Sequence, residues 1–165
     1  MKKIVINILI ILYFISAVII TYALLSYNKY NIFETNSKYI LTLKENNDDF
    51  KKSDLLIINK TEDLKQNDYV FYYDTYASKI TVKYAKIKNV ETINKEEKEV
   101  QLDNDLVISS ENVLGKKQDT NSYAGVGTIY NILTSKWGYL FIIIFPMLIA
   151  FIYEIYQIFK EIKKK

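Results

Sequence analysis

The two ends of the chain are long apolar runs, and these runs restrict its possible folds more than any other feature. Residues 4–25 carry no charge. As a helix they extend about 33 Å, enough to cross a hydrocarbon core of ~30 Å. Residues 137–159 are apolar apart from a few polar side chains, and Pro146 within them is tolerated in membrane helices. We therefore expect two transmembrane α-helices, an N-terminal anchor over residues 1–25 and a C-terminal helix over residues 137–159.

Each apolar run also has an alternative interpretation. The first could be a cleaved signal peptide, but the apolar region of a signal peptide is typically ~7–15 residues long and precedes small residues at the cleavage site. Here a longer run leads into Leu24 and Leu25. In the second run, Glu154 lies close to the end, where the lipid headgroups accommodate an acid, and the alternative is a functional carboxylate within the membrane.

The distribution of the lysines predicts the orientation of the chain in the membrane. Every basic residue is a lysine, and residues 26–136 hold 16 Lys against 17 Asp and Glu, so the excess positive charge lies at the two tips. Because lysine-rich ends stay in the cytoplasm, we expect a two-pass plasma-membrane protein with both termini cytoplasmic, including a Lys-rich tail over residues 160–165. Residues 26–136 would then be extracytoplasmic, and their near-neutral charge gives no basis for nucleic-acid binding.

The composition also restricts the chemistry. The chain contains neither Cys nor His, which rules out a disulfide framework, a Cys/His metal site, an imidazole base and a thiolate nucleophile within this chain. A Ca²⁺ or Mg²⁺ site made of carboxylates alone stays open as an alternative, but no Asp-rich run has the spacing of a calcium loop. We therefore expect no cofactor and no metal.

The middle region is a series of short β-type runs separated by polar turn segments, which predicts a small, mainly β domain with antiparallel strands. In the longest run, apolar residues alternate with lysines, so Ile80, Val82 and Tyr84, with Ile87 as a further candidate, should face the core. Residues 113–116 and 126–132 close the domain. The runs are residues 39–43, 55–58, 69–73, 79–90, 100–102, 106–108, 113–116 and 126–132.

Several of these segments resemble, in order, motifs of the signal peptidase I family, in its archaeal and endoplasmic-reticulum-like branch. Residues 53–58 (SDLLII) look like the run that follows the nucleophile loop, and residues 64–70 (LKQNDYV) look like the next strand entry. Residues 80–84 (ITVKY) fall where the family carries its base, and residues 110–116 (SENVLGK) and 123–160 resemble the closing segments. The resemblance implies a compact β domain at the outer membrane surface.

The resemblance also implies a serine nucleophile beside a Lys or His base, and here both positions are substituted. The nucleophile position falls on Glu45 and the base position on Val82. The family's Val-Lys pattern makes Lys83 a candidate substitute base, and the favoured alternative is that Lys83 is an outward-facing strand lysine. As a base, its partner would be one of three serines outside a family-like loop: Ser37, Ser53 or Ser78.

Three hypotheses follow. The first is a non-catalytic relative of signal peptidase that binds exported or membrane-anchored polypeptides as an assembly factor or chaperone, since a peptide groove survives loss of the dyad. The second is an active serine endopeptidase with a displaced Ser/Lys dyad. The third is a membrane-tethered structural β domain.

Overall fold

The computed structural model describes residues 2–30, 32–76, 80–93 and 98–163. The chain forms two compact units. One consists of Met1–Leu24 with Ile129–Lys165, and the other of Leu25–Thr128.

The first unit contains the two long apolar helices that the sequence predicts. Helix α1 covers Lys2–Leu25, and the C-terminal helix runs through α3 (Lys136–Gly138), the π-helix η3 (Tyr139–Ile144) and α4 (Phe145–Ile162). The segments Ile8–Leu25 and Lys136–Lys160 are long and apolar enough to cross a membrane. Most of their large apolar side chains are exposed, as expected of side chains that face lipid.

A stripe of residues four apart joins α1 to η3. Tyr13, Ala17 and Thr21 lie on one side of α1, and Ala17 is buried. The Tyr13 hydroxyl donates to the carbonyl of Ile143, and the hydroxyls of Thr21 and Tyr139 are 2.8 Å apart. Small and hydroxyl-bearing residues are typical of contacts between membrane helices, because they allow close approach and hydrogen bonding.

Pro146 explains why a hydroxyl is useful at this contact. Proline has no N–H, so the Ile142 carbonyl four residues earlier loses its usual α-helical donor. The Tyr13 hydroxyl lies 3.3 Å from the Ile142 oxygen as well as contacting that of Ile143. One side chain of α1 thus supplies a donor beside the carbonyls that precede the proline.

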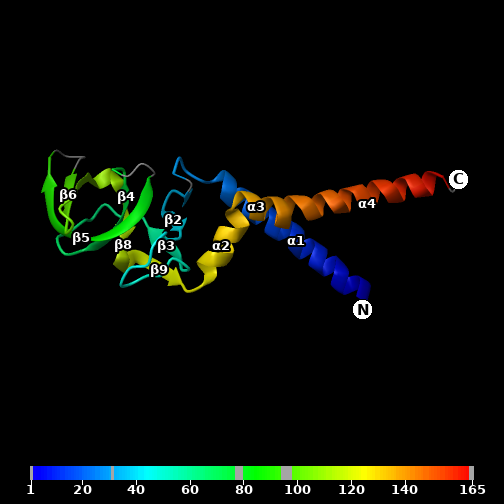
Figure 1. Ribbon diagram of the computed structural model, residues 1–165, viewed down its shortest axis with the longest axis horizontal. Helices are drawn as coiled ribbons and strands as arrows, with labels where there is room; N and C mark the ends of the chain where they lie inside the picture. Colours follow the sequence, from blue (N-terminus) through cyan, green and yellow to red (C-terminus); the bar gives the residue numbers. More distant parts are fainter. Residues whose placement is uncertain (1, 31, 77–79, 94–97, 164–165) are drawn as a thin grey trace. The chain divides into compact units, whose positions relative to one another are not determined.

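The second unit consists of two antiparallel β-sheets (Figure 1), which confirms the predicted mainly β domain flanked by apolar helices. One sheet has the order β1-β2-β3-β9, and the other has the order β7-β6-β5-β4-β8. The strands of the first are β1 (Phe33–Glu34), β2 (Lys38–Leu41), β3 (Leu55–Asn59) and β9 (Thr120–Tyr123). Those of the second are β4 (Tyr69–Asp74), β5 (Thr81–Thr92), β6 (Lys98–Leu102), β7 (Val107–Ser109) and β8 (Val113–Lys116).

Strand β4 is buried on both faces and contributes to two hydrophobic clusters. Val70 and Tyr72 pack in one cluster with Ile87, Val100 and Leu102. Phe71 and Tyr73 pack in the other, whose members also include Leu41, Phe50, Leu56, Ile58 and Leu114. A continuous apolar run is what a strand with a core on each face requires.

Strand β5 is long and curved, and it changes partner along its length (Figure 1). Its first half pairs with β4, from Thr81 opposite Asp74 to Lys86 opposite Tyr69. From Ile87 onward it pairs with β6, and the register shifts between Ile87 and Asn89.

The core face predicted for β5 is correct for three residues and wrong for Ile87. Ile80, Val82 and Tyr84 pack against the cluster that contains Phe71, whereas Ile87 belongs to the opposite cluster. The reason is parity: residues an odd number apart on a strand point to opposite faces.

The closing segments also differ from the sequence prediction. Residues 126–132 are not a β-type run but lie in helix α2 (Val126–Thr134). Strand β9, which pairs with β3, is polar and was not predicted. A strand at the edge of a sheet, exposed along most of its length, needs no apolar alternation.

Gly115 allows β8 to pass close to β3. A Cβ at this position would lie 2.3 Å from the backbone oxygen of Asn59 and 2.6 Å from Cγ2 of Ile58. Since the nearest atom belongs to the backbone, only a residue without a Cβ fits between the two sheets here.

Candidate functional site

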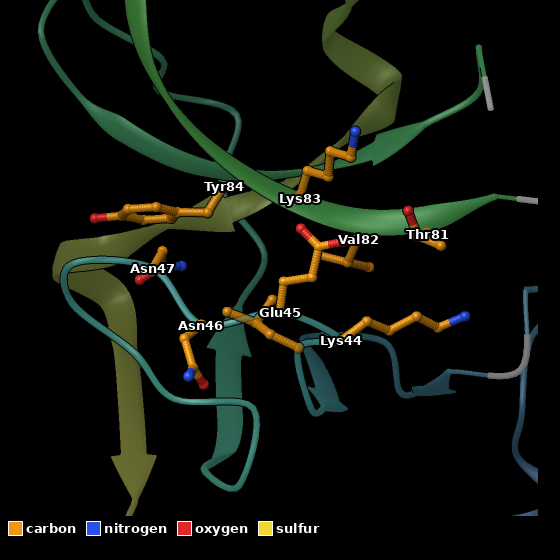
Figure 2. A pocket seen from close by; sticks show the side chains of 9 residues that line it. Lys44, Glu45, Asn46, Asn47, Thr81, Val82, Lys83 and Tyr84 are labelled. Atoms are coloured by element: carbon orange, nitrogen blue, oxygen red, sulfur yellow. The ribbon is translucent and has the colours of Figure 1, made fainter.

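A pocket lies between the start of β5 and the segment that follows β2. Its volume is about 180 Å³, and it is open to solvent. Figure 2 shows its side chains, which come from two stretches of chain. The lining consists of Leu43, Lys44, Glu45, Asn46 and Asn47 on one side and Thr81, Val82, Lys83 and Tyr84 on the other.

The structure brings together the residues that the resemblance assigns to the nucleophile and base positions. Glu45, Val82 and Lys83 all line this pocket, although 37 residues separate Glu45 from Val82 in the sequence. In Figure 2 the Glu45 side chain reaches toward β5 beside Val82, while the Lys83 amine points away from Glu45.

Two of the candidate serines, Ser37 and Ser53, are described by the structure, and neither lines the pocket. Ser37 lies in the turn between β1 and β2, where its carbonyl accepts from the Lys60 N–H. The Ser53 hydroxyl donates to Oδ1 of Asp54 at 3.4 Å. Ser78 lies outside the described residues. The hydroxyls at the pocket are those of Thr81 and Tyr84.

Lys83 is held by an acid that the sequence analysis did not identify. Its Nζ lies 2.7 Å from Oδ2 of Asp74, a buried carboxylate at the end of β4. The hydrogen bond to Asp74 and the charge of that carboxylate raise the pKa of Lys83. A lysine that acts as a general base at neutral pH needs a lowered pKa, so this pairing favours the protonated, non-basic form.

A second ionic contact holds the loop between β2 and β3, which lies beside the pocket. The Tyr84 hydroxyl donates to Oδ2 of Asp49, and Nζ of Lys117 donates to Oδ1 of the same carboxylate. These hydrogen bonds, first that from Lys117 and then that from Tyr84, lower the pKa of Asp49. The Tyr84 ring also stacks on Tyr69 and contacts Phe50 edge-on, so the loop is attached to β5 by both charge and packing.

The pocket adjoins a stretch of strand edge that pairs with no other strand among the described residues. The Ile87 N–H donates to Asp68 on the β4 side, whereas the Lys86 carbonyl accepts from Asp103 on the β6 side. Because hydrogen-bonding directions alternate along an antiparallel strand, the backbone groups of Val82 and Tyr84 share the side of Lys86, away from β4. Strand β6 begins pairing only at Ile87. Among the described residues, no backbone hydrogen bond to a neighbouring strand covers that side of Val82 or Tyr84.

The features missed from the sequence involve residues far apart in the chain. Asp49 and Lys117 are 68 residues apart, and no local pattern connects them. The Asp74–Lys83 pair had a signal, because two adjacent apolar runs predict a hairpin whose register brings residues near its tip together. The open edge required knowing where β6 begins to pair.

Comparisons of the chain with protein-family models, with curated proteins and with solved structures find no match. The resemblance to signal peptidase I rests on short motifs of the sequence alone.

Proposed function

We propose that this chain is a non-catalytic relative of signal peptidase I that binds an extended segment of an exported or membrane-anchored polypeptide. It would act as an assembly factor or chaperone for exported and surface proteins. The observation that carries the proposal is the edge of β5 at Val82 and Tyr84, which no strand covers in the part of the chain that the structure describes and which lies directly beside a pocket.

An open strand edge recognises a peptide through its main chain. A segment added antiparallel or parallel to β5 hydrogen-bonds to the free N–H and C=O groups, and a neighbouring pocket accepts one of its alternate side chains. Pockets that enclose a whole small ligand are typically ~300–1,000 Å³. At about 180 Å³, this pocket better suits part of a chain than a complete small molecule.

Two features of the pocket favour binding over cleavage. Its lining carries an acid, Glu45, at the position where the resemblance implies a serine nucleophile. Its lysine, Lys83, is paired with Asp74 and has a raised pKa, which opposes proton abstraction from a hydroxyl.

The first experiment tests the edge with a pair of variants at one position. Val82→Pro removes the outward N–H but leaves the β4 side of the strand without a missing donor, because that N–H does not face β4. Val82→Ala is the matched control, because both variants lose the packed valine side chain but only the alanine variant keeps the backbone N–H. A photo-crosslinking residue at exposed Asn46 in the lining reports occupancy.

The probe is a labelled precursor carrying a signal peptide, inserted with the full chain into liposomes. We expect crosslinking for the parent and for Val82→Ala, and its loss in Val82→Pro. Equal crosslinking in both variants would show that the edge does not hold the precursor. Circular dichroism of both variants checks that the sheet is intact.

A cleavage assay on the same liposomes separates binding from proteolysis. We expect no mature product from the chain while an active signal peptidase processes the precursor. Product that disappears with Lys83→Ala would overturn the non-catalytic assignment and identify Lys83 as a working base.

A further inference from the structure

Helix α2 has an apolar face and a polar face that are clearly separated. At about 100° per residue, all its large apolar side chains fall within one arc, and Gly127, Thr128, Asn131 and Thr134 fall on the other side. Three of the apolar side chains are strongly exposed: Val126 at 43%, Ile129 at 61% and Ile132 at 51%. The apolar arc consists of Val126, Ile129, Tyr130, Ile132 and Leu133.

The helix is inverted relative to a helix on the surface of a soluble domain, which packs its apolar face on the core. Here the buried residue is Gly127, which belongs to the polar side. A Cβ on Gly127 would lie 2.7 Å from the carbonyl oxygens of Ser53 and Asp54. Gly127, on the polar side of α2, therefore packs closely against the backbone of residues 53–54, whereas the exposed apolar side chains lie on the opposite arc of the helix.

The position of α2 in the chain brings its end close to a candidate membrane span. Only Ser135 separates its last residue, Thr134, from the candidate membrane span Lys136–Lys160. One residue of chain reaches at most ~3.6 Å, so the end of α2 stays beside the end of that span. Trp137, 69% exposed, is one residue into the span and is of the type enriched at membrane interfaces.

We infer that α2 is an interfacial helix that inserts Val126, Ile129 and Ile132 into the boundary between headgroups and acyl chains of the bilayer. The inference rests on Lys136–Lys160 crossing a membrane and does not depend on peptide binding at β5. An amphipathic helix lies in the interface plane with its apolar face buried in the lipid. The separation of apolar from polar side chains around α2 is what such a helix requires. The closeness of its end to the span would keep it at the membrane surface.

The test uses the absence of cysteine in the chain. Single cysteines at Ile129, on the apolar arc, and at Thr128, its exposed neighbour on the polar side, are labelled with an environment-sensitive fluorophore. The full-length variants are placed in phosphatidylcholine–phosphatidylglycerol liposomes with or without nitroxide-labelled lipid. Both positions are exposed, so neither label displaces a buried side chain.

We expect blue-shifted emission at position 129 and quenching by the nitroxide lipid about twofold or more stronger than at position 128. Equal quenching at the two positions would overturn the inference. A blue shift at position 129 that weakens as protein is diluted in lipid would assign the arc to a second copy of the chain. A shift that appears only when a precursor is added would assign it to that precursor's apolar segment.

Discussion

Asp49 is a single acid that connects the loop beside the pocket to two other parts of the β unit, through Tyr84 and Lys117. Its lowered pKa means that the carboxylate stabilises the fold above its ordinary pKa of about 4 and loses this contribution as pH falls through the folded value. Asp49→Asn should therefore lower stability near neutral pH by less than about 1 kcal/mol, because the pair is partly exposed.

Denaturation midpoints measured across a pH series test this prediction. The variant should lose part of the decline in stability that the parent shows below about pH 4. Asp48→Asn is the matched control, a neighbouring exposed acid without these hydrogen bonds in the described structure. Identical pH dependence in the parent and Asp49→Asn would contradict the role given to Asp49.

Tyr13 makes a separate prediction within the helical unit. Tyr13→Phe removes the hydroxyl that donates to Ile143 and lies near the Ile142 carbonyl, while keeping the ring. Hydrogen bonds between membrane helices contribute ~0.6 kcal/mol on average and up to ~1.7 kcal/mol. The free energy of unfolding of the helical unit should therefore fall by an amount within that range.

The measurement is the stability of the full chain in detergent micelles, compared with Tyr153→Phe. The Tyr153 hydroxyl accepts from Gln157 within α4 and does not link the two helices. If both variants lose the same stability, the Tyr13 contact does not hold α1 and η3 together.

At the residue scale, the sequence predicted part of the candidate site. The order of the family-like motifs selected Glu45, Val82 and Lys83 as candidate site residues, and all three line one pocket. Their roles remain predictions. The partner of Lys83 was not identified, because residue type does not reveal that Asp74 becomes buried beside it.

Among the elements, the strands with apolar residues were predictable and those without were not. Strand β4 was predictable from five consecutive aromatic and aliphatic residues. Strand β9 is a polar edge strand that is held in place by pairing with β3, and its own residues give no such signal. Helix α2 was assigned to the β domain because so short a run of apolar residues is compatible with either a strand or a helix.

Gly115 yields the element-scale prediction. Gly115→Ala forces β8 and β3 apart, because the new methyl group meets the backbone of Asn59, and it should destabilise the domain by about 1–3 kcal/mol. Equilibrium denaturation measures the effect.

The control substitution is Gly125→Asn. Gly125 has a φ of +74° and open space around it, and asparagine tolerates this left-handed conformation. A Gly115→Ala variant no less stable than Gly125→Asn would show that the sheets can separate at little cost.

For the whole molecule, the two apolar helices establish candidate spans, while the orientation remains a prediction based on lysines. With no cysteine to remove, Lys52→Cys in the β unit and Lys163→Cys after α4 can be labelled selectively. In intact cells, a membrane-impermeant maleimide should label Lys52→Cys, and Lys163→Cys only after permeabilisation. The reverse pattern would place the β unit in the cytoplasm.

The double burial of β4 has a consequence for how this domain can change. Val70 and Tyr72 fill one cluster, and Phe71 and Tyr73 fill the other, so neither sheet retains its core without this strand. Neither sheet is therefore an exchangeable module. Unfolding should proceed in a single cooperative step, and recombination within the gene would have to transfer both sheets together to yield a folded product.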